Sequence, residues 1–147
     1  MLIGQYQSQF GEKNRVMIPK KFRNILGEQF IVARWYEKCL VLVSLQSWDT
    51  LISKVTGQSN LVTTPVRDTD RFILGSAFEI EVDAQGRFIV PGVLKDYAGF
   101  KNEVIFLGLG DRIEVWDKEE WEKREKYIAE NAAELLENIA KGISSNA

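Results

Sequence analysis

One nine-residue pattern occurs twice in the chain, 72 positions apart. The first copy, GEKNRVMIP, runs from Gly11 to Pro19, and the second, DAQGRFIVP, runs from Asp83 to Pro91. Each copy has five turn-like residues that end in arginine, then three apolar residues and a proline. A chain of 147 residues that repeats such a pattern is expected to contain two related structural units.

The match continues on both sides of the pattern. Apolar and polar residues alternate over residues 6–10 and 78–82, which is the period of a half-buried strand. The three apolar residues at 16–18 and 88–90 predict a second strand in each copy.

Short helices are predicted next, over KKFRNILG and GVLKDYAG. Pro19 and Pro91 would take the first helical position, and Gly27 and Gly99 would follow the last turn. Two further strands and a longer helix complete each unit, in the segments QFIVARW with CLVLVSLQSW and NEVIFLGL with DRIEVWDKEEW. One copy offers too little strand to close its own core, so two copies are expected to pack as one pseudo-symmetric barrel.

The turn has the same physical requirement in both copies. Asp83 opens the second turn, and Gly86 stands where a hairpin often needs a positive φ. Asn14 takes that place in the first turn, and asparagine tolerates the left-handed conformation better than most residues. The two turns should therefore form similar hairpins that present Arg15 and Arg87.

Several classes of site are disfavoured by composition. The chain has no histidine, which is the commonest general base and the commonest metal ligand, and its single cysteine, Cys39, allows no disulfide framework. Cys39 precedes the run LVLVSL and is predicted to be buried. We therefore predict no catalytic residue, no metal site, no cofactor and no small-molecule substrate.

Membrane insertion and secretion are not expected either. No apolar run approaches the roughly 20 residues of a membrane helix, and MLIGQYQSQF lacks the regions of a signal peptide. The predicted location is the cytoplasm.

The formal net charge of −2 conceals an uneven distribution. Residues 1–40 hold seven basic and three acidic residues, a balance of +4, whereas residues 111–147 hold ten acidic and six basic ones, a balance of −4. Five of the basic residues lie close together, namely Lys13, Arg15, Lys20, Lys21 and Arg23. Local concentrations of this kind steer a polyanion more than the total charge does.

The doubled pattern resembles the MraZ family, which is related to the AbrB/SpoVT group of bacterial DNA-binding proteins. The family pattern is D-x-x-x-R followed by a short apolar strand and proline. Residues 83–91 fit it fully, whereas the first copy has Gly11 in place of Asp and Asn14 in place of the usual Gly. The resemblance covers about residues 1–143, and two copies in matching contexts are far more specific than one.

This resemblance implies a mainly β fold with flanking helices, a pseudo-symmetric double-split (swapped-hairpin) β-barrel built from two internal repeats. The expected segments are a first SpoVT/AbrB-like repeat at 1–56, a connecting loop and helix at 57–77, a second such repeat at 78–117, and a C-terminal amphipathic helix and tail at 118–147. In the connecting segment, Thr64 is the predicted N-cap and Pro65 the first helical residue.

The resemblance also implies a transcriptional regulator. Its partner would be DNA, as tandem promoter repeats upstream of the division and cell-wall gene cluster, and it would form a cyclic homo-oligomer associated with the nucleoid. A ring-forming protein–protein interaction scaffold without DNA binding remains the alternative. A hydrolase is disfavoured because no nucleophile–base pair is visible in the sequence.

The predicted DNA-binding residues are Lys13, Arg15, Lys20 and Arg87, and the predicted structural residues of the turns are Asn14, Asp83 and Gly86. Each prediction has a structural alternative: an ion pair for the arginines, such as Arg87 with Asp83, and a solvated helix face for Lys20. Lys21 and Arg23 stay open between the same two roles.

Four further features have simple structural interpretations. Residues 108–111 should be a plain turn between strands, and Glu79 and Glu81 should face solvent on a strand. Trp116 and Trp121 are predicted to anchor the core or a subunit interface.

Overall fold

The computed structural model describes residues 1–57 and 62–142. It divides after Asp117 into two compact units, and each unit is described separately below. The middle of the predicted connecting loop, residues 58–61, and the predicted tail from Ile143 onward lie outside the described residues.

The first unit is mainly β, and short helices connect its strands. Its strands are β1 (Leu2–Gln9), β2 (Arg15–Met17), β3 (Gln29–Arg34), β4 (Leu40–Ser44), β5 (Phe78–Glu81), β6 (Arg87–Ile89), β7 (Glu103–Gly110) and β8 (Ile113–Asp117). Its helices are α1 (Lys20–Leu26), α2 (Trp48–Val55), α3 (Thr64–Ile73) and α4 (Gly92–Ala98), with 3₁₀ turns η1 (Glu12–Asn14), η2 (Tyr36–Lys38) and η3 (Leu74–Ser76).

Both repeats contribute strands to one antiparallel sheet. Within the described residues its order is β1-β7-β8-β4-β3-β5, so strands of the two copies are interleaved, with β7 and β8 of the second copy between β1 and β4 of the first, and β1 and β5 form the edges. The predicted mainly β architecture with helices is confirmed. The described strand pairs leave this sheet open at its two edges and do not close it into a barrel.

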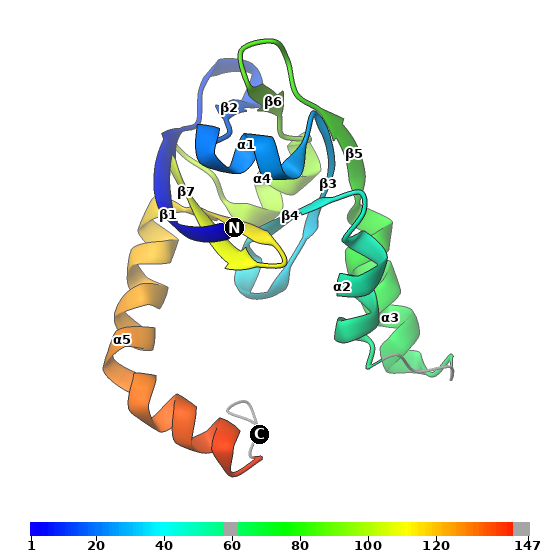
Figure 1. Ribbon diagram of the computed structural model, residues 1–147, viewed down its shortest axis with the longest axis vertical. Coiled ribbons are helices and arrows are strands. Elements are labelled where there is room, and N and C mark those ends of the chain that lie inside the picture. Colours follow the sequence, from blue (N-terminus) through cyan, green and yellow to red (C-terminus); the bar gives the residue numbers. More distant parts are fainter. Residues whose placement is uncertain (58–61, 143–147) are drawn as a thin grey trace. The chain divides into compact units, whose positions relative to one another are not determined.

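A second, two-stranded sheet joins the repeats directly. β2 pairs antiparallel with β6, with Val16 opposite Phe88. The two strands lie side by side at one end of the unit, next to α1 and α4 (Figure 1). Within its own repeat, β2 is linked to the β1 segment by an isolated bridge between Phe10 and Val16 and by the Ser8 hydroxyl, which donates to the Met17 carbonyl at 2.8 Å. The turns expected from sequence are present, but the strands that follow them pair with each other across the repeats.

Reciprocal backbone bonds continue this exchange beyond the strands. The Ile18 N–H donates to the Gly86 carbonyl at 3.0 Å, and the Val90 N–H donates to the Asn14 carbonyl at 2.8 Å. A shift of 72 residues converts one bond into the other. Each repeat therefore holds the turn of its counterpart.

The core is shared in the same way. Buried apolar side chains come in pairs separated by 72 residues: Val16 with Phe88, Ile18 with Val90, Phe22 with Leu94, and Leu26 with Ala98. Rings also cross between repeats, since Phe30 and Phe88 meet edge to face with their centroids 5.3 Å apart. The two repeats therefore contribute to one shared core.

The predicted helix starts are wrong by one residue. Pro19 and Pro91 have ψ angles of 132° and 139°, which are extended, so both prolines precede their helices and do not occupy the first turn. Their carbonyls accept the first helical N–H groups, those of Phe22 and Arg23 and of Leu94 and Lys95. At α3 the extended cap is Thr63 instead of Thr64, and its carbonyl accepts the Arg67 N–H at 2.9 Å.

Three of the smaller structural predictions are confirmed. Cys39 is fully buried and Trp116 is 6% exposed, and burial raises the pKa of the Cys39 thiol. Glu79 and Glu81 are exposed on β5.

The predicted turn at 108–111 lies later in the chain, because residues 108–110 still belong to β7 and only Asp111 and Arg112 join it to β8. Trp121 lies on α5, where no residue is buried, so its role at a subunit interface stays a prediction.

The second unit contains one long helix, α5 (Lys118–Ala140), with no buried residue. Several of its apolar side chains are exposed, including Leu136 and Ile139. In the part of the chain that the structure describes, no helix combines the length and apolar character needed to cross a membrane.

Candidate nucleic-acid interface

The paired strands β2 and β6 form a small ribbon with two distinct faces. Val16 and Phe88, at its centre, are 1% and 2% exposed and point into the core. Because side chains alternate along a strand, the flanking residues face outward. The outer face consists of Arg15, Met17, Arg87 and Ile89, with Arg15 opposite Ile89 and Met17 opposite Arg87.

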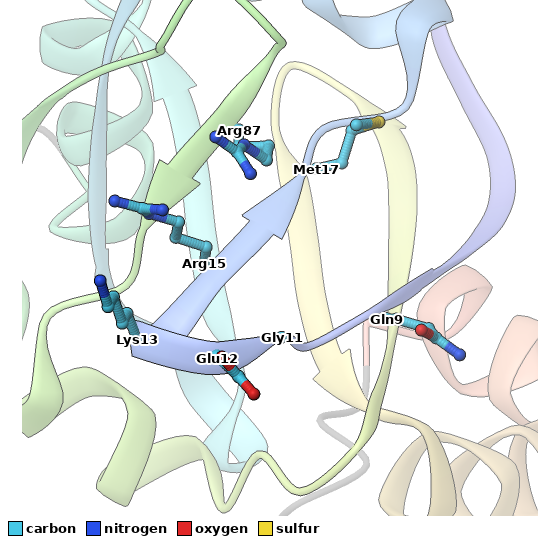
Figure 2. Close-up of a pocket in the computed structure, with 7 residues that line it drawn as sticks. All are labelled: Gln9, Gly11, Glu12, Lys13, Arg15, Met17 and Arg87. Atoms are coloured by element: carbon cyan, nitrogen blue, oxygen red, sulfur yellow. The ribbon is translucent and has the colours of Figure 1, made fainter.

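A hollow of about 350 Å³ lies against this ribbon. It is lined by Gln9, Gly11, Glu12, Lys13, Arg15, Met17 and Arg87. Figure 2 shows the nitrogen-bearing ends of Lys13, Arg15 and Arg87 gathered on one side, with the Glu12 carboxylate turned the other way in this view. Three positive charges and one negative charge therefore border the hollow, a local balance of +2.

The second turn is organised by one carboxylate. Asp83 Oδ1 accepts the backbone N–H groups of Gln85 and Arg87, both at 2.9 Å, and Oδ2 accepts the Arg87 Nε–H at 3.0 Å. These bonds, led by that from the Arg87 backbone, hold the pKa of Asp83 below its ordinary value. The ion pair weighed as an alternative role for Arg87 is thus present, and it uses only Nε of the guanidinium.

The first turn reaches a similar backbone path without a carboxylate. In both turns the opening residue donates to the closing arginine carbonyl at 2.8 Å, from Gly11 to Arg15 and from Asp83 to Arg87. The Arg15 N–H, however, donates to the Glu12 backbone carbonyl. Lys13 and Asn14 make this possible because both adopt left-handed φ angles, 58° and 59°.

The side chain of Arg15 therefore differs from that of Arg87. Within the described ranges, no carboxylate pairs with the Arg15 guanidinium, whereas Asp83 binds that of Arg87 at a surface where both side chains are more than a third exposed. Arg15 offers all its donors to a ligand. Arg87 offers its two Nη groups while Asp83 fixes the direction of the side chain.

Arg23 supports the second turn from the other repeat. Its Nη2 donates to the Ile18 carbonyl at 3.3 Å, and its guanidinium lies against Gly86. A Cβ atom on Gly86 would come within 1.9 Å of Arg23 Cζ, and the φ of Gly86 is +82°. Glycine is required at position 86 for both reasons. This contact explains Arg23, whose role the sequence left open.

Of the four residues predicted to bind DNA, three come together. Lys13, Arg15 and Arg87 line the hollow, whereas Lys20 lies exposed at the start of α1 and is not among the lining residues. Lys21 is also exposed, and its Nζ lies 5.9 Å from the centroid of the Tyr6 ring. Sequence reasoning missed Met17 and Gln9; the alternation around buried Val16 was the available indication for Met17.

The chemistry of this surface is that of hydrogen-bond donation. Guanidinium groups can donate two parallel bonds to guanine edges or to phosphate oxygens, and an exposed lysine can contact phosphate. The described residues contain no cluster of three or more His, Cys, Asp or Glu side chains placed to hold a metal ion.

Comparisons with known proteins identify the family of the chain and the two halves that match it. The family described as "MraZ protein, putative antitoxin-like" matches residues 1–72 and again 73–141. Two proteins named "Transcriptional regulator MraZ" are 41% identical: that of Leuconostoc citreum, with 97% of this chain and 96% of that protein covered, and that of Acetivibrio thermocellus, with 92% and 96% covered. The protein of that name from Caldanaerobacter subterraneus is 38% identical, with 95% and 96% covered. The doubled match and the full-length relatives show that this chain belongs to the MraZ family.

Proposed function

We propose that this protein is a sequence-specific DNA-binding transcriptional regulator, that it is not an enzyme, and that the β2–β6 ribbon is its DNA-binding surface. The single observation that carries the proposal is the placement of Arg15 and Arg87 on the outer face of one ribbon, with Lys13 beside them along a shared hollow. The printed names of the relatives support the regulatory role.

Each residue has a distinct part in the proposed contact. A two-stranded ribbon is narrow enough to enter the major groove, where arginine reads guanine through its O6 and N7 atoms. Arg15 and Arg87 are the proposed readers, and Lys13 contacts phosphate. Lys20, on the exposed start of α1, is a further proposed phosphate contact. Asn14, Asp83 and Gly86 set the shape of the two turns.

The proposal extends to the assembly. The reciprocal bonds of Ile18 and Val90 support a double-split, swapped-hairpin β-barrel with repeat units at 1–56 and 78–117. One ribbon makes few base contacts, so affinity would come from a cyclic homo-oligomer that places several ribbons on tandem promoter repeats. Leu136 and Ile139 of α5, 68% and 74% exposed, provide apolar surface for self-association. The expected targets lie upstream of the division and cell-wall gene cluster, which places the protein on the nucleoid in the cytoplasm.

A mobility-shift titration tests the proposal. The purified chain should retain DNA from upstream of its own gene at lower concentration than scrambled DNA of the same composition, and added salt should weaken both complexes. Equal retention of the two DNAs would refute sequence-specific binding.

The exposed apolar residues of α5 also fit the alternative, a ring-forming protein–protein interaction scaffold. The two functions separate in one preparation. A protein that light scattering shows to be a ring, but that retains neither DNA at low salt, would be a scaffold. A monomer at micromolar concentration would exclude both the scaffold and the multivalent mechanism.

A further inference from the structure

The outer face of the ribbon contains two apolar side chains that the arginines do not account for. Met17 and Ile89 are 47% and 53% exposed, although each lies next to a fully buried neighbour of its strand. They occupy equivalent positions in the two repeats, 72 residues apart, as Arg15 and Arg87 do. The face is therefore a diagonal pattern of two arginines and two apolar residues.

This pattern matches what the major groove presents. Guanine offers acceptors that arginine can read, and thymine is the one base that offers an apolar group, its C5 methyl. Met17 lines the same hollow as Lys13, Arg15 and Arg87, so a DNA segment held by those cations would contact Met17 as well. Figure 2 shows Met17 on β2 at the end opposite to Arg15.

The spacing is also compatible. Residues two apart on one strand face are separated by about 6.6–6.8 Å, and two base-pair steps of B-DNA rise about 6.8 Å. Along a groove, Arg15 and Met17 of one strand therefore reach bases two steps apart, and Arg87 and Ile89 do the same on the other strand.

Resting on the proposed function, we infer that Met17 and Ile89 are specificity-determining residues that read the C5 methyl groups of thymines in the major groove. The basic rim of the hollow argues for DNA as the occupant of this face in preference to a second copy of the chain. The inference assigns different bases to the two kinds of side chain on the ribbon: the arginines read guanine, and the two apolar side chains read thymine.

Replacing deoxythymidine by deoxyuridine tests this directly, because it removes the methyl group and nothing else. The probe is the shortest upstream fragment that the full-length protein retains, made with either base. Loss of one buried methyl contact should weaken wild-type binding about fourfold. Met17→Ala and Ile89→Ala should weaken binding to thymine DNA, with little further loss on uracil DNA. Such non-additivity is the signature of a direct contact.

Three variants control for unrelated effects. Met17→Leu keeps an apolar side chain and should retain the preference for thymine, whereas Met17→Gln should remove the part of it that Met17 supplies, leaving that of Ile89, at unchanged melting temperature. Leu109→Ala truncates an equally exposed residue at the far end of β7 and should leave both affinities unchanged. Thymines replaced one at a time should locate the positions that Met17 reads.

Three results would overturn the inference. One is equal weakening of thymine and uracil DNA by both variants, which would mark a contact that does not involve the methyl group. Another is a change of oligomeric state in Met17→Gln with the thymine preference intact, which would mark an interface between copies. The third is tight binding by the wild type that does not depend on the methyl group. If the wild type retains neither fragment, the proposed function itself fails, and that outcome is distinct from the third.

Discussion

The two turns of the ribbon are closed by the same backbone bond, from the opening residue to the arginine carbonyl, but they reach it by different means. In the second turn, Asp83 binds two backbone N–H groups and the Arg87 guanidinium, and Gly86 makes room for Arg23. In the first turn, Lys13 and Asn14 adopt left-handed φ angles, and Gly11 stands at the position that Asp83 occupies in the second. The comparison shows that the closing bond of the turn forms without the aspartate of the family pattern, whereas the carboxylate that binds the arginine guanidinium belongs to the second turn.

The largest expected effect is on DNA affinity. Arg15→Ala should cost about 1–3 kcal/mol per base contact, roughly fivefold to 150-fold in affinity, repeated in each subunit on the DNA. Arg87→Ala should cost less, because Asp83 already occupies one of its donors. Titrations of both variants on upstream DNA measure this, with melting temperatures as the control for folding. A greater loss in Arg87→Ala would mean that the ion pair prepares Arg87 for binding.

The next effect concerns stability. Gly86→Asn copies the first turn and should displace Arg23, at a cost of about 1–3 kcal/mol for crowding a packed site. In the first turn, Asn14 occupies the position of Gly86, and Lys95 is the counterpart of Arg23. The Lys95 Nζ lies 5.7 Å from the centroid of the Phe10 ring. Adding Arg23→Lys to Gly86→Asn should therefore restore part of the stability in urea unfolding. A double variant less stable than the sum of the single changes would contradict the equivalence of the two turns.

A smaller effect separates the electrostatic attraction of phosphate from the reading of bases. Lys13→Ala should lower the slope of log affinity against log salt by about one unit and weaken upstream and scrambled DNA alike. Arg87→Ala should instead narrow the difference between the two DNAs. Lys20→Ala should lower the slope as well, because Lys20 is the second proposed phosphate contact, although it does not line the hollow. An unchanged slope in Lys13→Ala would show that other residues, and not Lys13, contact phosphate.

The smallest effect is on the pH dependence of stability. The folded-state pKa of Asp83 lies below its ordinary value of 3.8, chiefly because of the Arg87 backbone bond. Its stabilisation is therefore present above about pH 4 and is lost as the pH falls through the folded-state pKa. The difference in unfolding free energy between wild type and Asp83→Asn should shrink from pH 7 toward pH 2. Asp68→Asn, in the exposed pair with Arg71, is the matched control.

Much of this structure follows from local sequence. The alternation at residues 78–82, the glycines after both short helices and the shared 72-residue offset predicted the strands, the helix ends and the common core. Asn14 was correctly placed as the left-handed residue of the first turn. These features depend on neighbours in the chain, which sequence patterns record.

The remaining features depend on contacts between distant residues. Nothing near Arg23 indicates that it lies on Gly86, 63 positions away, and nothing near β2 indicates that its partner is β6. The turns predicted from the turn residues are correct, but the strands that follow them pair across the repeats. They do so because each strand buries a central apolar residue in the same core. The helix starts were wrong by one residue because proline fits either side of that boundary.

The exchange between repeats has a consequence for how the protein is made. The paired residues of β2 and β6 are 70 to 74 positions apart, and such contacts form late and slowly. A nascent chain cannot present the Arg15 face until residues near Val90 have left the ribosome, since the bond that holds Asn14 comes from Val90. Products of translation that end before Val90 would thus lack the ribbon altogether.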